Sequence, residues 1–220
     1  MNVLVSTVPR SGSTLLFNIC RLLFEQVYGK DKTYATWCQF HKQESEKEYN
    51  IIKIHDRNIK YTNWSNKIIT SIRDIRYIIA SYADFNKKFN INDPNNLMGV
   101  CKGFLRIIEN NCGVADYIFR YEEYFKDSHK VISDIAKCLE LPLEKININL
   151  LLKEIEKIKK AKYKNLDAGK TQMHPNHISP KSSAHITERM TIEQLRFIET
   201  NFSWFFPKYG YEITSLIKML

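Results

Sequence analysis

Within the first thirty residues, an apolar run gives way to a short Pro/Gly/Ser segment and then to apolar residues at helical spacing. This pattern constrains the fold more than any other feature of the chain. Val3–Val8 is a β-rich apolar run, which favours a buried strand. Pro9–Ser13 then interrupts the run with Pro, Gly and two Ser. From Thr14 onward, apolar residues recur at helical spacing, so the spacing predicts a helix that ends at Gly29. A chain that opens as strand, tight loop and helix is typical of α/β proteins.

The same alternation continues along the chain and predicts the fold class. Further strand-like runs lie at Ile51–Ile54, Lys67–Ile72 and Tyr117–Tyr121. Helical spacing is found at about residues 74–85, 97–112, 131–141, 145–160 and 191–201. Strands that alternate with helices indicate a parallel sheet covered on both faces. We therefore predict a single three-layer α/β/α domain over residues 1–220, with a central, mainly parallel sheet.

The charge balance favours an anionic partner. Lys and Arg total 33 and Asp and Glu total 24, which gives a net charge of +9. This excess favours a nucleic acid, a nucleotide, a phosphate or sulfate ester, or an acidic surface. The five cysteines are dispersed without C-x-x-C pairs, which argues against a zinc ribbon or a disulfide scaffold and suits a reducing compartment. We find neither an apolar run of membrane-spanning length nor a signal peptide, so the expected location is cytoplasmic.

The loop after the first strand has the composition of an anion-binding turn. Backbone N–H groups at a helix N-terminus, together with the helix dipole, bind phosphate-like anions. Gly12 permits the positive φ that such a turn can need. Hydroxyl donors come from Ser11, Ser13 and Thr14, and Arg10 adds a planar cation. The alternative is an ordinary helix start with Ser13 as the N-cap. The loop is not a Walker A motif, because no lysine follows the glycine.

Three segments resemble one family in the same order along the chain. Pro9-Arg10-Ser11-Gly12-Ser13-Thr14-Leu15-Leu16 resembles the 5′-phosphosulfate-binding loop of sulfotransferases that use 3′-phosphoadenosine 5′-phosphosulfate (PAPS), in its bacterial and carbohydrate form. Residues 69–82 resemble the family's 3′-phosphate-binding segment, in which an Arg at a strand end precedes a Ser by eight positions, as Arg73 precedes Ser81. Residues 118–127 resemble the Y-E-D-L strand end, which places Tyr121 near the adenine.

This resemblance extends over about residues 1–140 and implies a P-loop NTPase-like sulfotransferase fold. It implies that PAPS is the co-substrate, that 3′,5′-ADP (PAP) is the product, and that no metal is needed. The residues that it implies for nucleotide binding are Arg10, Ser11, Gly12, Ser13, Thr14, Leu15, Arg73, Ser81 and Tyr121.

The second strand ends in the candidate acid–base residues. Alternation along an extended chain puts Lys53 and His55 on the same side. A histidine can remove a proton from a hydroxyl or amine, and a lysine can stabilise negative charge on the transferring group. The arrangement resembles the K-T-H-L-P segment of cytosolic sulfotransferases, whose His is the catalytic base, although Asp56 and Arg57 stand where Leu and Pro would. Other branches of the family use Glu as the base. The alternative interpretation, in which His55 is a strand-end histidine without a catalytic role, is also open.

On this hypothesis His55 deprotonates the acceptor, while Lys53 and Arg10 hold the sulfonate and the bridging oxygen during an in-line transfer. Three further histidines, His41, His129 and His185, are interpreted as surface residues.

The C-terminal third is less informative. The polar composition of residues 165–185 predicts a long loop. The R-K-G sequence with which the family closes over the nucleotide is absent, so Lys181, with His177 and Ser179, is the candidate for that role. An ordinary solvent loop is the alternative. The lysine run from Lys153 to Lys164 is interpreted as a solvated helix face.

Two further function classes are open. A nucleotide kinase of related architecture is disfavoured by the missing Walker lysine. A non-catalytic nucleic-acid-binding protein fits the net charge but lacks a recognisable motif. We therefore expect a PAPS-dependent sulfotransferase with a small-molecule, carbohydrate or lipid acceptor and without a nucleic-acid partner. Residues 30–50 and 86–100 are expected to line the acceptor side.

Overall fold

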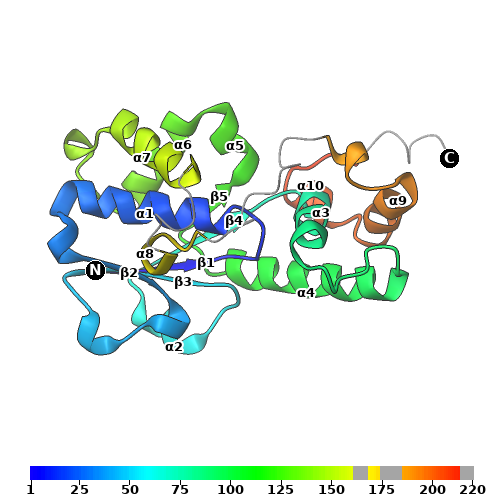
Figure 1. Ribbon diagram of the computed structural model, residues 1–220, viewed down its shortest axis with the longest axis horizontal. Coiled ribbons are helices and arrows are strands. Elements are labelled where there is room, and N and C mark those ends of the chain that lie inside the picture. Colours follow the sequence, from blue (N-terminus) through cyan, green and yellow to red (C-terminus); the bar gives the residue numbers. More distant parts are fainter. Residues whose placement is uncertain (161–167, 174–184, 214–220) are drawn as a thin grey trace. The chain divides into compact units, whose positions relative to one another are not determined.

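A computed structural model of the chain describes residues 1–160, 168–173 and 185–213 (Figure 1). Within it the chain divides into two compact units. The first comprises Met1–Ile72 and Ile107–Pro175, and the second comprises Arg73–Arg106 and Asn176–Leu220. The assignment of residues 1–220 to one domain stays a prediction.

The first unit is built on a five-stranded sheet whose neighbouring strands are all parallel. In spatial order the strands are β2 (Thr33–Trp37), β3 (Tyr49–Ile54), β1 (Asn2–Ser6), β4 (Lys67–Ile72) and β5 (Tyr117–Arg120). This architecture confirms the predicted α/β class with a central parallel sheet. Strand β1 lies in the middle, and its residues Val3, Leu4 and Val5 are fully or almost fully buried on both faces, as expected for a central parallel strand.

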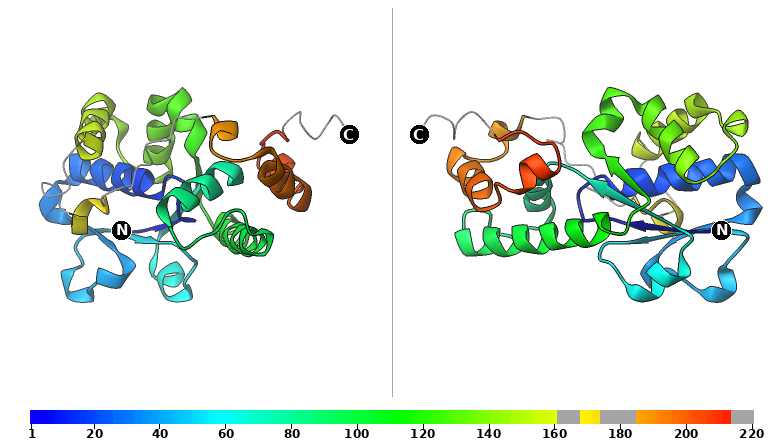
Figure 2. Two further views of the ribbon diagram at one scale, coloured as in Figure 1. Left: turned by 45° about the vertical axis from the view of Figure 1, so that its right-hand side comes forward. Right: turned by 180° about the vertical axis from the view of Figure 1, so that it is seen from behind.

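Helices cover both faces of this sheet (Figures 1 and 2). The helices and 3₁₀ turns of the first unit are α1 (Ser13–Tyr28), η1 (Lys30–Lys32), η2 (Cys38–Phe40), η3 (Gln43–Ser45), α2 (Ile59–Trp64), α5 (Tyr121–Lys126), α6 (Ser128–Cys138), η4 (Leu143–Lys145), α7 (Ile148–Lys160) and α8 (Ala168–Thr171). On one face, Val5 and Ile51 belong to a core with α1, α6 and α7. On the other face, Leu4 and Ile52 pack with Tyr61 and other residues of α2 and η2.

The second unit is helical in its described part. Its elements are α3 (Ile75–Phe85), the first part of α4 (Pro94–Cys112), η6 (Ile186–Glu188), α9 (Ile192–Asn201) and α10 (Phe205–Lys208). Helix α3 buries Ile75, Ile78 and Ile79. Ion pairs of buried arginines join α3 to the C-terminal elements, so segments more than a hundred residues apart in sequence are held together.

The structure also contains elements that the sequence patterns missed. Strand β2 was not predicted, because Thr33–Trp37 is a short edge strand that mixes buried and half-buried residues. The short helices α2 and α5 lack the several turns needed to show helical spacing. Tyr121 was predicted to end a strand but is the first residue of α5. The predicted loop over 165–185 includes the helical turn α8, and residues 174–184 lie outside the described residues.

Candidate active site

The loop between β1 and α1 contains two residues with a left-handed backbone. Arg10 has a φ of 69° and Gly12 a φ of 92°. This conformation costs a non-glycine residue energy, and such strain is concentrated at functional sites. Gly12, rather than Ser13, is the N-cap of α1, and among the described residues no side chain bonds to this cap. The N–H groups of the first helical turn and the positive end of the dipole therefore lie at the loop, as an anion site requires.

The ring of Tyr121 packs directly on Gly12. A Cβ atom at position 12 would overlap Cδ2 of Tyr121 and would lie 3.0 Å from Cε2 of the same ring. Position 12 therefore requires glycine for two reasons: its φ is positive, and the Tyr121 ring leaves no space for a Cβ atom. Because Tyr121 follows β5 directly, the carboxyl end of β5 brings an aromatic ring to the loop.

The side chain of Ser11 holds the loop in place. Its hydroxyl bonds to the carbonyl of Val8 at 2.7 Å and to the hydroxyl of Ser71 at 2.5 Å. Ser11 has one hydroxyl proton, so donation to Val8 leaves Ser71 as the donor of the second bond. The Ser11 hydroxyl is thus turned inward, and its N–H group remains the atom suited to an anion. Ser71 lies at the carboxyl end of β4, so this bond ties the loop to the sheet.

Lys53 connects β3 to the start of α1. Its Nζ donates to Thr14 Oγ1 at 2.8 Å, and it lies 5.6 Å from the centroid of the Trp37 ring. Only 3% of Lys53 is exposed. Burial, together with the positive charge of Arg10, lowers the pKa of Lys53 to about 7. The positive charge of Arg10 therefore disfavours the protonated form of Lys53.

His55 lies just after β3 and is held in one tautomer. Its Nδ1 is 3.0 Å from the backbone carbonyl of Thr7. A carbonyl oxygen only accepts, so Nδ1 carries the proton and Nε2 keeps its lone pair. Burial and the charges of Lys53 and Arg10 lower the pKa of His55 to about 4, although the bond to Thr7 opposes this shift. The imidazole is therefore neutral at pH 7, with Nε2 able to accept a proton.

The structure adds residues that the sequence patterns did not single out. The Trp37 ring lies edge-on to His55, with 4.7 Å between centroids, so the last residue of β2 packs beside both Lys53 and His55. Thr7 sets the tautomer of His55, and Ser71 braces the loop. Each of these residues stands at or just after the carboxyl end of a strand, which is the signal that could have found them.

Helix α1 also carries a buried polar stripe at helical spacing. Asn18 donates to the carbonyl of Thr171 at 2.7 Å, and its side-chain oxygen accepts from Arg21 at 3.0 Å. Arg21 bonds to Glu25 at 2.9 Å, and Glu25 pairs with Lys170 at 2.8 Å. The stripe docks α8 on α1, the helix that begins at the Pro9–Ser13 loop. Polar residues at i, i+3 and i+7 in an otherwise apolar helix indicate such a contact.

In the second unit, Arg73 follows β4 directly and folds back over α3. Its guanidinium carbon lies 5.4 Å from the centroid of the Tyr77 ring, one helical turn into α3. This position shortens the gap to Ser81, which is one further turn along and 5% exposed. Eight residues of helix correspond to about 12 Å of rise between Arg73 and Ser81. Because the Arg73 side chain extends along α3 to Tyr77, it spans part of this distance.

A buried ion-pair network fixes the start of α3. Asp74 caps the helix by accepting from the N–H of Arg76 at 2.9 Å, and it pairs with the Arg76 guanidinium at 2.5 Å. Arg76 also pairs with Glu199 of α9 and stacks on the ring of Phe206, 4.8 Å from its centroid. Burial opposes the charge of Arg76, but the two carboxylates keep its pKa raised. The segment that carries Arg73 is therefore anchored to the C-terminal helices.

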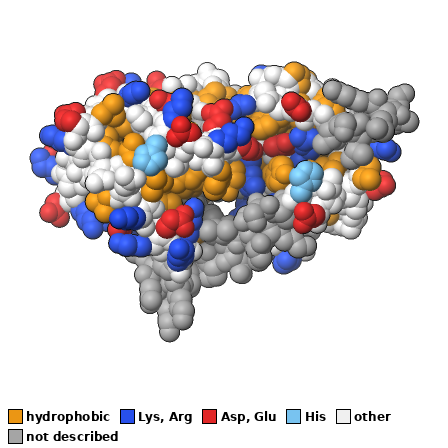
Figure 3. Space-filling view, turned by 90° about the horizontal axis from the view of Figure 1, so that it is seen from above, with side chains coloured by type: hydrophobic (Ala, Val, Ile, Leu, Met, Phe, Trp, Pro, Cys, Tyr) orange, Lys and Arg blue, Asp and Glu red, His pale blue; other side chains and the backbone are white. Residues whose placement is uncertain are grey.

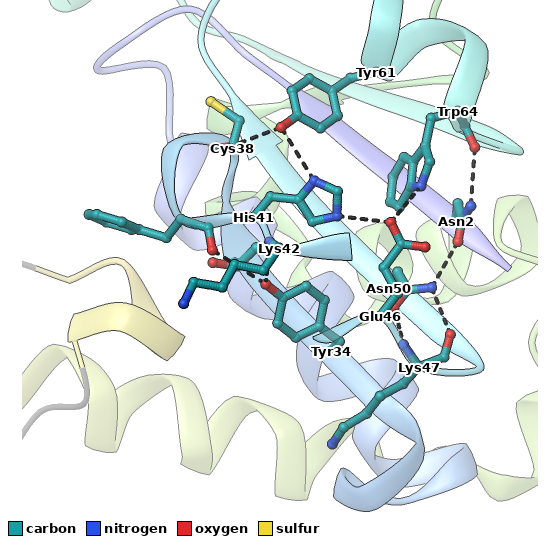
Figure 4. Close-up of polar contacts among 12 residues, drawn as sticks. Asn2, Tyr34, Cys38, His41, Lys42, Glu46, Lys47, Asn50, Tyr61 and Trp64 are labelled. Atoms are coloured by element: carbon teal, nitrogen blue, oxygen red, sulfur yellow. Dashed lines mark hydrogen bonds and ion pairs between the residues drawn. The ribbon is translucent and has the colours of Figure 1, made fainter. Parts of the chain in front are cut away.

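The prediction that His41 is a surface residue is wrong. Its side chain is 7% exposed and lies among polar and aromatic side chains on the face of the sheet opposite α1 (Figure 4). Nε2 of His41 contacts Glu46 at 2.9 Å, and the same carboxylate oxygen accepts from Trp64 Nε1 at 3.0 Å. Tyr61 donates to the carbonyl of Cys38 at 3.0 Å. The cluster joins the β2–β3 connection to α2. His129 and His185 are exposed, as predicted.

Part of the basic excess lies on α7. Lys157 and Lys159 of α7 pair with Glu154 and Glu156, as a solvated helix face would. Figure 3 shows basic and acidic side chains intermixed over this part of the chain. Lys181, with His177 and Ser179, lies outside the described residues. In the described part of the chain, no helix is long and apolar enough to cross a membrane, and no group of three metal-ligating side chains is present.

Comparisons with known proteins agree with this architecture. No family model matches the chain, and no curated protein matches it in sequence. Mouse sulfotransferase SULT7A1 complexed with PAP superposes with a TM-score of 0.60 at 14% identity, over 94% of this chain and 84% of that chain. Retinol dehydratase with retinol and PAP has a TM-score of 0.57 at 15% identity, and with androsterone and the inactive cofactor PAP 0.59 at 16% identity. Both retinol dehydratase structures cover 91% of this chain and 80% of that chain, so the chain shares its fold with these PAP-bound proteins.

Proposed function

We propose that this protein is a sulfotransferase that uses PAPS and releases PAP. The observation that carries the proposal is the arrangement at the carboxyl edge of the sheet. Lys53 bonds to the first turn of α1, and His55 stands two residues further on with Nε2 unprotonated. At the same edge, the loop between β1 and α1 presents the N-terminus of α1 to an anion. The shared fold with PAP-bound structures supports the same nucleotide.

The residues of the first unit divide into binding and chemical roles. The N–H groups of Ser11–Leu15 bind the 5′-phosphate, and the ring of Tyr121, packed on Gly12, lies on the adenine side. Lys53 and Arg10 stabilise the charge that develops on the bridging oxygen. In the second unit, Arg73 and Ser81 bind the 3′-phosphate.

The chemistry needs one proton acceptor. PAPS supplies the sulfuryl group, and transfer forms a bond from the acceptor oxygen or nitrogen to sulfur while the bond from sulfur to the 5′-phosphate oxygen breaks. Nε2 of His55 takes the proton that the acceptor loses. The Nδ1–H bond to Thr7 then stabilises the imidazolium that forms. Negative charge from the nucleotide raises the pKa of His55 above its value in the free protein, which makes it a stronger base when it is needed.

The acceptor is proposed to be a small molecule, a carbohydrate or a lipid that carries a hydroxyl or amine. Two of the neighbouring structures hold retinol and androsterone, which makes apolar alcohols the first compounds to screen.

A thermal-shift experiment tests the proposal before the acceptor is known. PAP raises the melting temperature more than ATP–Mg²⁺ does, because only PAP carries a 3′-phosphate for Arg73 and Ser81. The reverse ranking would indicate a nucleotide kinase. Binding of duplex DNA with a steep salt dependence and no competition from PAP would indicate a nucleic-acid-binding protein. Transfer of label from ³⁵S-PAPS in an acceptor screen then tests catalysis directly.

Binding of PAP is expected to be coupled to proton uptake by Lys53. Near pH 7 this lysine is only partly protonated, because its pKa is about 7, and a bound anion raises that pKa. The complex therefore holds more protons than the free protein, so affinity falls as pH rises above 7, by at most about tenfold per pH unit.

Calorimetry in two buffers measures this uptake. At pH 7.5, titration with PAP in Hepes and in Tris gives different apparent enthalpies, and the difference reports the protons taken up. Lys53→Met removes the difference, whereas Lys60→Met, an exposed lysine six residues past β3, keeps it. Equal enthalpies in the two buffers for the unmodified protein would contradict the assignment.

A further inference from the structure

The indole ring of Trp37 covers two residues of the proposed transfer step. Its centroid lies 4.7 Å from the centroid of the His55 ring and 5.6 Å from Nζ of Lys53. A ring at contact distance takes the place of water, and burial is the largest cause that lowers the pKa of both residues. The environment of His55 and Lys53 therefore depends on where Trp37 is held.

Pairing of β2 in the sheet holds Trp37 from one side only. Strand β2 lies at the edge of the sheet, and Trp37 with Lys53 is the last pair in its register with β3. The chain then leaves the sheet through η2. Element ends that make few contacts open easily. The contacts of residues 38–46 therefore determine how firmly the end of β2, with Trp37, is fixed.

Tyr61 of α2 fixes the first residue of this connection. Its hydroxyl donates to the Cys38 carbonyl at 3.0 Å, and the N–H group of His41 donates to the same carbonyl at 3.4 Å. The ring of Tyr61 also packs edge-on against the His41 ring, with 5.6 Å between centroids. The residue directly after Trp37 is thus tied to α2.

Glu46 fixes the other end of the connection to the same helix. One of its carboxylate oxygens contacts Nε2 of His41 at 2.9 Å and accepts from Nε1 of Trp64 at 3.0 Å (Figure 4). The His41 side chain is 7% exposed, so water competes little for these bonds. Tyr61 and Trp64 both belong to α2, so residues 38–46 are held at their beginning and at their end by one element.

We propose that this cluster is a clamp that keeps Trp37 over His55 and Lys53. The residues of the clamp are His41, Glu46, Tyr61 and Trp64. They are positioning residues, because they act through Trp37. The inference rests on the proposed function, in which His55 accepts the proton of the acceptor. With Trp37 in place, water is kept from the imidazole, so His55 stays neutral at a pH at which a hydrated histidine is protonated.

The test is an NMR titration of His55 in the free protein between about pH 4.5 and 8. The ring-proton signal is assigned from its loss in His55→Gln. In the unmodified protein the signal is expected to stay at its neutral position down to about pH 5, because burial lowers the pKa to about 4. Glu46→Ala removes both bonds of the carboxylate. We expect it to raise the pKa of His55 by about one pH unit or more, toward 6.5.

The charges around His55 make the direction of this change diagnostic. The charges that act on His55 are those of Lys53 and Arg10, and the variant keeps both. Loss of a negative charge at position 46 would by itself lower the pKa of His55, so a rise reports water at the ring. Glu46→Gln loses the same charge but keeps an oxygen for the two donors, and it is expected to restore most of the low pKa.

Two further variants complete the design. Tyr61→Phe removes only the hydroxyl that holds the Cys38 carbonyl, and it is expected to raise the pKa of His55 less than Glu46→Ala does. It also provides the test if Glu46→Ala does not fold. Asn63→Ala removes an exposed side chain of α2 and leaves the titration of His55 unchanged.

The outcomes separate this inference from the proposed function. An unchanged His55 titration in folded Glu46→Ala and Tyr61→Phe, even with a lower melting temperature, would show that the cluster only supports the fold. A His55 that titrates near pH 6.5 in the unmodified protein would also overturn the clamp, because the ring would then not exclude water. Calorimetry with PAP is a separate measurement. If the unmodified protein does not bind PAP, the proposed function fails, while the titration still shows whether the clamp holds Trp37.

Discussion

Replacing His55 by alanine lowers kcat by about 10²–10⁴-fold, the range expected when a general base is removed, while PAP affinity is unchanged. The reason is geometric. The Thr7 carbonyl fixes the proton on Nδ1, so Nε2 is the atom that accepts the acceptor's proton. Because this step occurs only in the transition state, kcat and kcat/KM for the acceptor fall together.

Single-turnover transfer from ³⁵S-PAPS, followed once an acceptor is known, measures this loss. His129→Ala is the matched control, since His129 is exposed on α6 and its loss is expected to have no effect. Turnover that survives in His55→Ala would move the base to a carboxylate.

The pH profile gives an independent check on the same residue. Protonated His55 cannot act as a base, so activity is lost as pH falls through its pKa. In the free protein, burial and the neighbouring cations lower that pKa to about 4, so the acid limb of kcat/KM for PAPS lies near pH 4 rather than near 6.5. The limb of kcat lies higher, because bound nucleotide adds negative charge.

Gly12→Ala is expected to weaken PAP binding strongly and to destabilise the fold. An alanine at a φ of 92° carries a backbone penalty of about 1–2 kcal/mol. Its Cβ also overlaps the Tyr121 ring, so either the loop or α5 must shift. A shift of the loop misplaces the N–H groups at the start of α1. Loss of two charge-assisted hydrogen bonds to the 5′-phosphate weakens binding by about 100-fold or more.

Calorimetric titration with PAP and urea denaturation measure the two effects. Gly99→Ala is the matched control, because Gly99 lies in α4 with open space around it and no positive φ, so alanine is neutral or stabilising there. Adding Tyr121→Ala to Gly12→Ala removes the overlap but not the backbone penalty, and it is expected to recover part of the stability. If Gly12→Ala binds PAP like the unmodified protein, the loop is not the 5′-phosphate site.

Some parts of the candidate site could be predicted from the sequence, and others could not. The apolar run of β1, the Gly/Ser loop and the helical spacing of α1 are local patterns, so residues 3–29 could be predicted within a residue or two. Lys53 and His55 were placed on one side of β3 by the two-residue period of a strand, and the shared contact with Trp37 agrees with this. Strand β2, which supplies Trp37, could not be predicted, because an edge strand of five residues carries too little alternation.

Contacts distant in sequence were decided by the tertiary structure alone. The burial of His41 depends on its contacts with Glu46, Tyr61 and Trp64. Local sequence patterns do not predict such contacts. The pairing of Arg189 with Asp84 is of the same kind.

By itself, the sequence of this protein determined the α/β class, the tight Gly/Ser loop before α1 and the positions of the cations along the chain. These depend on local periodicity and on residue type, which act over a few neighbouring residues. Only the tertiary structure decided which ring nitrogen of His55 carries the proton, that the Tyr121 ring packs on Gly12, and that Arg189, among the described residues, has buried donors without a partner. Those properties depend on a carbonyl, a ring or a carboxylate brought from another element, and packing alone sets which groups meet.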